Sequence, residues 1–291
     1  MRAFSMFLGL ILGALAIGAL LAYPGWLLLH PHFDFAFHRI ASRVGMLVLL
    51  AGFVLIARRL GVSDRTSLGY GLPRSVFLRE TGKAILLGAA LMLPIMLLMA
   101  AVGLRDWEDG VAPTAREWLS LAVNGLSTGI VVALIEETFL RGAMYTAIQR
   151  ESGAKAAIAL TALVYSSLHF FARVRIAPAD VTWTSGFDLL AGTLHTFADP
   201  LSIADAFLSL FAVGVLLGAV RQATGSIAAC IGLHAGWVWV LQVVRESTVA
   251  DRTHPASFLL SAFDGLVGWM LLAWTVVVGL ALQRFYARRG A

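Results

Sequence analysis

The sequence has little charge and almost no cysteine. Asp, Glu, Lys and Arg make up 13% of its 291 residues, whereas a soluble domain carries roughly 25%. The single cysteine, Cys230, excludes an internal disulfide and any metal site with several cysteine ligands. The net charge of +5 is modest and no nucleic-acid-binding motif is present, so we expect no nucleic-acid partner. An ordinary soluble domain and a disulfide-rich domain are both excluded.

Long apolar runs take the place of the missing charge. Hydrophobic residues make up 59% of the chain, with a mean hydropathy of +0.83. Several runs reach about 20 residues, enough to cross a hydrocarbon core of about 30 Å. We therefore predict an all-α, polytopic integral membrane protein that lies in a lipid bilayer. Eight membrane spans are expected, at 4–29, 37–57, 84–104, 117–148, 155–172, 202–221, 226–246 and 257–284.

The loops predict an orientation. The first span is too long for the apolar part of a signal peptide, so we expect it to be retained. With a cytoplasmic N-terminus, most Lys and Arg residues fall in cytoplasmic segments, above all in the basic loop 58–83. We predict that both termini are cytoplasmic, in a bacterial inner membrane. Pro94 is expected to kink the third span, and residues 186–197 are predicted to form an interfacial helix.

The fourth predicted span contains three charged residues, Glu136, Glu137 and Arg141. A charge at the bilayer centre costs about 2.5–3.5 kcal/mol or more, so such residues usually have a function. Glu137 and Arg141 have the i,i+4 spacing that favours an ion pair. Glu136 is rotated by about 100° on the helix and is the freer carboxylate. A desolvated glutamate with a pKa near neutrality suits general-base catalysis.

Two further spans carry polar groups, His169 in the fifth and His234 in the seventh. The turn at 149–154 predicts a helical hairpin of the fourth and fifth spans. The helix rise then places Glu136 about 18 Å and His169 about 21 Å from this turn, and His234 about 12 Å from the same membrane face. We expect the three side chains to face one cavity.

The motifs around these residues resemble those of the CPBP family, the CAAX proteases and bacteriocin-processing enzymes also called the ABI family. Residues 136–141 (EETFLR) match its EExxxR motif, and 165–169 (YSSLH) match FxxxH with Tyr165 in place of Phe. The HxxxN motif is matched only at His234, because Val238 stands at the Asn position. The resemblance covers 117–246, a predicted CPBP-like catalytic core. Residues 1–116 are expected to form three N-terminal spans with a basic cytoplasmic loop, and 247–291 a C-terminal transmembrane helix.

The resemblance implies an eight-helix intramembrane endopeptidase with a conical cavity, acting on a membrane-associated or peptide substrate, with lipidated substrates included. By this analogy Glu136 activates the attacking water, His169 assists it and His234 helps to stabilise the oxyanion. Glu137 and Arg141 would hold the first glutamate in place. Val238 cannot donate a hydrogen bond, and the loss of one oxyanion donor costs about 10²–10³ in rate. The neighbouring Trp237 offers an indole N–H that could replace it.

Other chemistries remain open. No cofactor is expected, but Glu136, His169 and His234 could form the His₂Glu set of a zinc-dependent metalloprotease. Catalysis by Cys230 with His234 is a weaker alternative, and Ser166 or Ser167 lack the GxSxG context of a serine nucleophile. The missing Asn supports a non-catalytic membrane binding or assembly factor. A transporter is a further alternative, because buried acids and histidines also mark proton relays.

Overall fold

The computed structural model describes residues 1–33, 35–170 and 175–289, and the side chains of these residues except 109 and 286–289. The contacts divide the chain into two compact units, 1–63 with 167–200 and 64–166 with 201–291. Each unit is described by itself. The division follows contacts rather than motifs, so the predicted segments 1–116, 117–246 and 247–291 stay a prediction.

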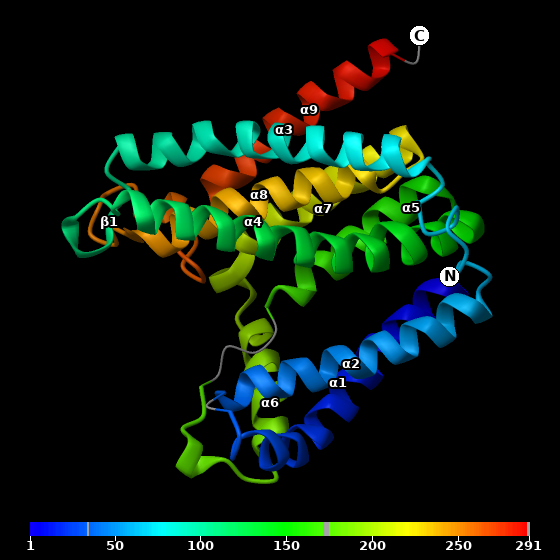
Figure 1. Cartoon of the computed structure of the whole chain (residues 1–291), viewed down its shortest axis with the longest axis horizontal. Coiled ribbons are helices and arrows are strands. Elements are labelled where there is room, and N and C mark those ends of the chain that lie inside the picture. Colours follow the sequence, from blue (N-terminus) through cyan, green and yellow to red (C-terminus); the bar gives the residue numbers. More distant parts are fainter. Residues whose placement is uncertain (34, 171–174, 290–291) are drawn as a thin grey trace. The chain divides into compact units, whose positions relative to one another are not determined.

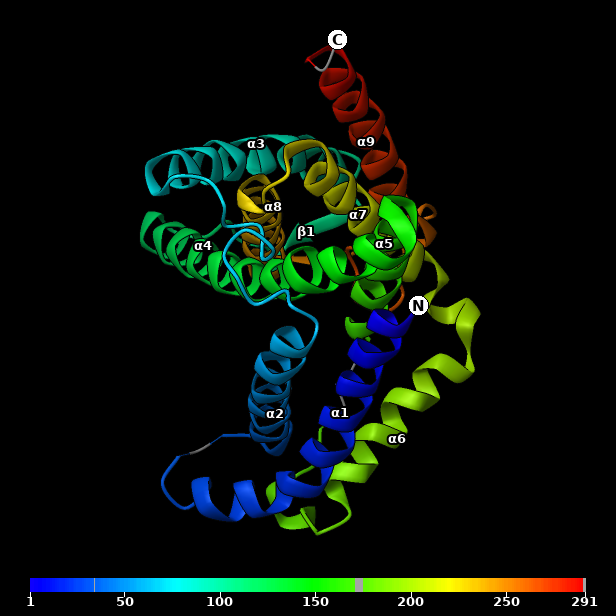
Figure 2. The same ribbon diagram turned by 90° about the vertical axis from the view of Figure 1, so that its right-hand side faces the viewer.

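The first unit is built from three helices, α1 (Arg2–Leu29), α2 (Phe37–Arg59) and α6 (Ser185–Ala198). Helix α1 packs against both α2 and α6 (Figure 2). The core of this unit contains Ala22, Phe37 and Leu189, one from each helix. Helix α6 confirms the helix predicted for 186–197, while its position at a membrane interface stays a prediction.

The second unit holds the remaining long helices, with α8 packed along both α3 and α4 (Figure 1). Helix α7 packs against α8 and α9. The α-helices of this unit are α3 (Arg74–Ala101), α4 (Ala115–Glu137), α5 (Tyr145–Leu168, whose last two residues fall in the first unit), α7 (Ala204–Thr224), α8 (Ala228–Ser247) and α9 (Trp269–Arg289). The shorter elements are η1 (Glu108–Gly110), the π-helix η2 (Thr138–Met144), η4 (Pro200–Ile203, whose first residue falls in the first unit) and η5 (Ser257–Leu259). A further short 3₁₀ turn, η3 (Pro178–Asp180), lies in the first unit.

Glycines fix the position of α8 on either side of His234. A Cβ added to Gly88 of α3 would lie 2.6 Å from the Leu233 carbonyl oxygen. A Cβ added to Gly129 of α4 would lie 2.5 Å from the Ala235 carbonyl oxygen. Small residues let membrane helices approach closely. The backbone that carries His234 is therefore held between α3 and α4.

Two short strands, which the sequence did not predict, join the ends of α3 and α8. Strand β1 (Arg105–Trp107) pairs antiparallel with β2 (Thr248–Ala250). The buried Arg105 side chain crosses this sheet and donates to Thr248 Oγ1 at 2.8 Å and to the Gly265 carbonyl oxygen at 2.6 Å. The sheet closes the end of the unit without changing its all-α character.

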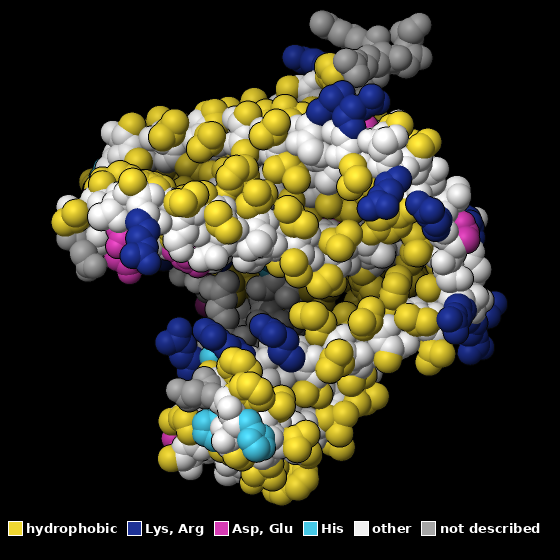
Figure 3. Space-filling view, in the orientation of Figure 1, with side chains coloured by type: hydrophobic (Ala, Val, Ile, Leu, Met, Phe, Trp, Pro, Cys, Tyr) yellow, Lys and Arg dark blue, Asp and Glu magenta, His cyan; other side chains and the backbone are white. Residues whose placement is uncertain are grey.

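The prediction of an all-α, polytopic membrane protein is confirmed. Six helical segments of the described chain are long and apolar enough to cross a membrane, and Trp269–Phe285 is a shorter apolar helix. The segment Ala115–Leu168 contains two predicted spans and turns at Gly153, whose φ is +83°. Many leucines and valines of α3 and α4 are exposed, and hydrophobic side chains cover the face over these helices (Figure 3). Such a surface suits contact with lipid.

Two predicted boundaries were wrong, and a third falls partly outside the described residues. Helix α3 begins directly after Pro73, ten residues before the predicted span, so that much of the predicted basic loop 58–83 is helical. The last helix begins at Trp269 instead of 257, because Gly265 has a φ of +74° and Asp264 Oδ1 accepts from the Leu266 and Val267 amides. Helix α5 ends at Leu168, and the end of the predicted span 155–172 lies outside the described residues.

Candidate active site

The first motif lies where α4 changes into the π-helix η2. Helix α4 begins at a capping box, in which Thr114 Oγ1 accepts from the Glu117 amide and Glu117 accepts from the Thr114 amide. It ends at Glu137, and the backbone then forms i→i+5 bonds through Thr138–Met144. The sequence predicted an uninterrupted helix over 117–148. Single π-helical turns occur frequently at functional sites.

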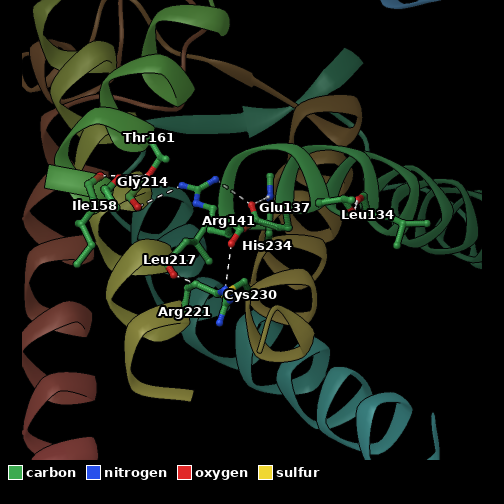
Figure 4. Close-up of polar contacts among 12 residues, drawn as sticks. Leu134, Glu137, Arg141, Ile158, Thr161, Gly214, Leu217, Arg221, Cys230 and His234 are labelled. Atoms are coloured by element: carbon green, nitrogen blue, oxygen red, sulfur yellow. Dashed lines mark hydrogen bonds and ion pairs between the residues drawn. The ribbon is translucent and has the colours of Figure 1, made fainter. Parts of the chain in front are cut away.

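Glu137 is the hub of the buried polar cluster. Its side chain is 0% exposed, and Oε1 accepts from Arg141 Nη1 at 3.0 Å (Figure 4). The same oxygen lies 2.9 Å from His234 Nδ1. The ion pair with Arg141 agrees with the predicted i,i+4 spacing. The contact with His234 was not expected, because the helix rise placed His234 about 6 Å nearer the cytoplasm.

Arg141 connects this hub to two other helices. Its guanidinium is buried and donates from Nη2 to the Gly214 carbonyl oxygen of α7 at 3.1 Å. Its Cζ lies 4.8 Å from the centre of the Tyr165 ring of α5, a cation–π distance. The Tyr165 ring in turn meets the His234 ring edge-on, with centroids 5.7 Å apart. The predicted supporting residue Tyr165 thus lies in the same cluster.

The Glu137 contact favours one tautomer of the His234 ring. A carboxylate paired with Arg141 is an acceptor, so His234 Nδ1 carries the hydrogen that it shares with Glu137. The second nitrogen, Nε2, is then the one available to another group. This is the arrangement in which a carboxylate orients a functional histidine.

Glu136 differs from its neighbour in exposure. It is partly exposed, whereas Glu137 is 0% exposed. Glu136 Oε2 and Glu137 Oε2 are both buried and have no hydrogen-bond partner among the described residues. Glu136 is therefore the more exposed of the two residues, although its unpartnered oxygen is itself buried.

The other predicted site residues have different surroundings. His169 follows α5 directly, in a turn, and belongs to the first unit. Its pairing with Glu136 therefore stays a prediction. Trp237 is 5% exposed on α8 and Val238 is partly exposed. The replacement of the missing Asn by the Trp237 indole also stays a prediction.

The sequence left metal and cysteine chemistry open as alternatives for this site. Across residues 1–33, 35–170 and 175–289, no three His, Cys, Asp or Glu side chains are grouped so that they could hold a metal ion. His169 lies in the first unit and Glu136 and His234 in the second, so the zinc set predicted from these three residues stays a prediction. The Cys230 thiol is buried and lies 3.4 Å from the Leu217 carbonyl oxygen. It packs between α7 and α8.

Sequence reasoning missed two residues that contact η2. The Tyr70 hydroxyl lies 2.6 Å from Thr138 Oγ1, next to Glu137. Burial raises the pKa of Tyr70, so its phenol stays protonated. Arg221 of α7 donates from Nε to the Arg141 carbonyl oxygen at 3.0 Å. A lone arginine before the end of an apolar helix was the available signal for Arg221, and nothing in the pattern around Tyr70 indicated its contact.

Comparison with known families identifies the region around this site. The family model of the Rce1-like type II CAAX prenyl endopeptidases matches residues 118–240, which contain all three motifs. The match covers less than half of the chain. The match confirms the predicted family and enzyme class, an intramembrane endopeptidase that hydrolyses peptide bonds. Searches of curated proteins and of solved structures find no match.

Proposed function

We propose that this protein cleaves peptide bonds in the membrane by means of a water molecule activated by Glu136. The observation that carries the proposal is the different environment of two adjacent glutamates. Glu137 is fully buried and held by Arg141 and His234. Glu136 is partly exposed and has an oxygen without a partner in the described part of the chain.

In this mechanism Glu136 is the general base. It accepts a proton from the water that attacks the peptide carbonyl carbon, and the protonated carboxyl can then pass the proton to the leaving amine. General-base catalysis of this kind contributes about 10²–10⁴ in rate. The mechanism retains the predicted role of His169, which would hold the same water.

His234 serves the developing oxyanion through Nε2. Because Nδ1 is bonded to Glu137, Nε2 is the ring nitrogen that can donate to the oxyanion, which requires the ring to carry a proton on both nitrogens. Glu137 and Arg141 thus fix the orientation of His234 as well as the end of α4. Trp237 is the candidate for the second donor.

The substrate is a peptide held at the membrane. The matched family is named for endopeptidases that act on prenylated CAAX proteins. The exposed apolar helix surfaces bring this chain into the bilayer, where a lipidated or membrane-inserted segment would meet it. We therefore propose a membrane-associated peptide or protein substrate, with lipidated substrates included.

The test uses the full-length protein in proteoliposomes. Quenched fluorescent peptides, anchored at one end by a prenyl group, an acyl chain or an apolar helix, report cleavage. Glu136→Gln keeps the side-chain volume and removes the base, so we expect the rate to fall by about 10²–10⁴. Glu80→Gln is the matched control, because Glu80 is exposed and pairs only with Arg79 and Lys83 at the surface of α3.

Two results would contradict the proposal. One is cleavage by folded Glu136→Gln at the rate of the unmodified chain. The other combines two observations. The wild-type chain cleaves no anchored peptide, and Glu136→Gln supports the same cellular phenotype as the wild-type chain. The second result favours a membrane binding or assembly factor, the alternative suggested by the aliphatic Val238 at the Asn position.

A further inference from the structure

Arg221 is a buried cation that the proposed chemistry does not use. It lies four residues before the C-cap Gly225 of α7, where a basic side chain would ordinarily extend to solvent. Its side chain is instead 7% exposed. No carboxylate of the described residues forms an ion pair with it, and its close partners are the Arg141 carbonyl oxygen, Thr146 Oγ1 and the Tyr145 ring. Because burying a charged side chain costs free energy, a buried arginine usually has a specific partner.

The backbone of η2 explains what Arg221 binds. In an α-helix the Tyr145 amide would donate to the Arg141 carbonyl oxygen, four residues earlier. Here the Tyr145 amide donates to the Leu140 and Gly142 carbonyl oxygens, on either side of Arg141. The Arg141 carbonyl oxygen thus loses its α-helical donor where the π-helix ends. Arg221 Nε donates to this oxygen at 3.0 Å in its place.

The chain segment before α3 covers another side of the same turn. A Cβ added to Gly142 would lie 2.8 Å from the Leu68 carbonyl oxygen, so this segment is in direct contact with η2. Thr146 Oγ1 donates to the Ser67 carbonyl oxygen at 2.7 Å. The π-helix is therefore held from two sides, by the 64–73 segment and by Arg221 of α7.

We propose that Arg221 is a positioning residue that stabilises the π-helical turn and thereby the placement of Glu136 and Glu137. Arg141 is the residue whose side chain binds Glu137 and whose carbonyl oxygen binds Arg221. If the turn relaxes from i→i+5 to α-helical i→i+4 hydrogen bonds, each turn contains fewer residues. The side chains before the turn then rotate relative to those after it. Glu136 and Glu137, which precede the turn, then rotate relative to Arg141, which lies within it.

The kinetic test of this proposal rests on the proposed endopeptidase activity. Amide hydrogen exchange tests it independently of that activity. Arg221→Met removes the donor, and Arg221→Lys keeps a cation that can reach the carbonyl oxygen. Trp274→Phe is the matched control, because it removes another side-chain donor to a helix carbonyl oxygen, that of Leu91 at 2.7 Å. All variants are reconstituted as full-length protein in nanodiscs, with Arg221→Gln as a smaller neutral donor in case the methionine variant does not fold.

We expect Arg221→Met to lower kcat by about 10- to 100-fold, since misplacement by 1 Å can cost about 10². KM for the best-cleaved anchored peptide should change by less than about twofold, because in this proposal Arg221 acts through the backbone of η2 and not through the substrate. Amide exchange in 138–146 should become faster. Arg221→Lys should restore most of kcat and most of the protection against amide exchange. Arg221→Gln should lie between the lysine and methionine variants, and Trp274→Phe should behave as wild type in both measurements.

Two outcomes overturn the proposal. The first is unchanged exchange of 138–146 in folded Arg221→Met or, if that variant does not fold, in Arg221→Gln. The second is a lysine variant as defective as the methionine variant. Failure of the proposed function looks different, because the wild-type protein then cleaves none of the peptides. The exchange comparison still decides the role of Arg221 in that case.

Discussion

Replacement of Glu137 by Gln tests the buried cluster most sharply. The substitution keeps the side-chain volume but leaves the Arg141 guanidinium buried, with the Gly214 carbonyl oxygen and the Tyr165 ring as its remaining partners. Removal of one partner of a buried ion pair costs about 3–5 kcal/mol. We therefore expect the free energy of unfolding to fall by about 3–5 kcal/mol, a large part of the stability of most domains.

The double-mutant cycle shows whether this cost belongs to the pair. Arg141→Met alone should be similarly destabilising, because it leaves the Glu137 carboxylate buried with His234. The combined variant removes both charges, and its loss should be smaller than the sum of the single losses by about 1–3 kcal/mol. Unfolding in mixed detergent and SDS micelles measures all four proteins. Additive losses, or a loss below about 1 kcal/mol for Glu137→Gln, would refute the reasoning.

Three further predictions follow from other contacts. Gly142→Ala should destabilise the protein by about 1–3 kcal/mol, because the new Cβ would lie 2.8 Å from the Leu68 carbonyl oxygen. In the same unfolding assay Gly82→Ala should be neutral or slightly stabilising, because its Cβ would meet nothing within 4 Å. Cys230→Ala should retain cleavage, and maleimide should label Cys230 only after unfolding, because the thiol is buried; labelling of the native protein would contradict this packing. Chelators should leave the cleavage rate unchanged, and a loss that zinc restores would revive the metalloprotease alternative.

The sequence predicted the parts of the site that follow from spacing along one helix. The Glu137–Arg141 pair follows from i,i+4 geometry, and the turn near Gly153 follows from the polar break between two apolar runs. Burial of charges in a span was enough to mark the segment as functional. The family resemblance added the second and third motifs.

Contacts between helices could not be predicted in this way. The His234–Glu137 bond depends on how closely α8 packs against α3 and α4 at Gly88 and Gly129. The π-helix leaves no periodic pattern in its side chains, because the change lies in the backbone bonds. Arg221 binds a backbone carbonyl oxygen, and such an acceptor has no signature in the sequence.

The most direct test of the division between the two glutamates compares Glu136→Gln with Glu137→Gln in both cleavage rate and free energy of unfolding. For Glu136→Gln we predict a rate lower by about 10²–10⁴ and a free energy of unfolding within about 1 kcal/mol of wild type. For Glu137→Gln we predict the large loss of stability. Wild-type cleavage by Glu136→Gln, or a stability loss equal to that of Glu137→Gln, would contradict the assignment of Glu136 as the base.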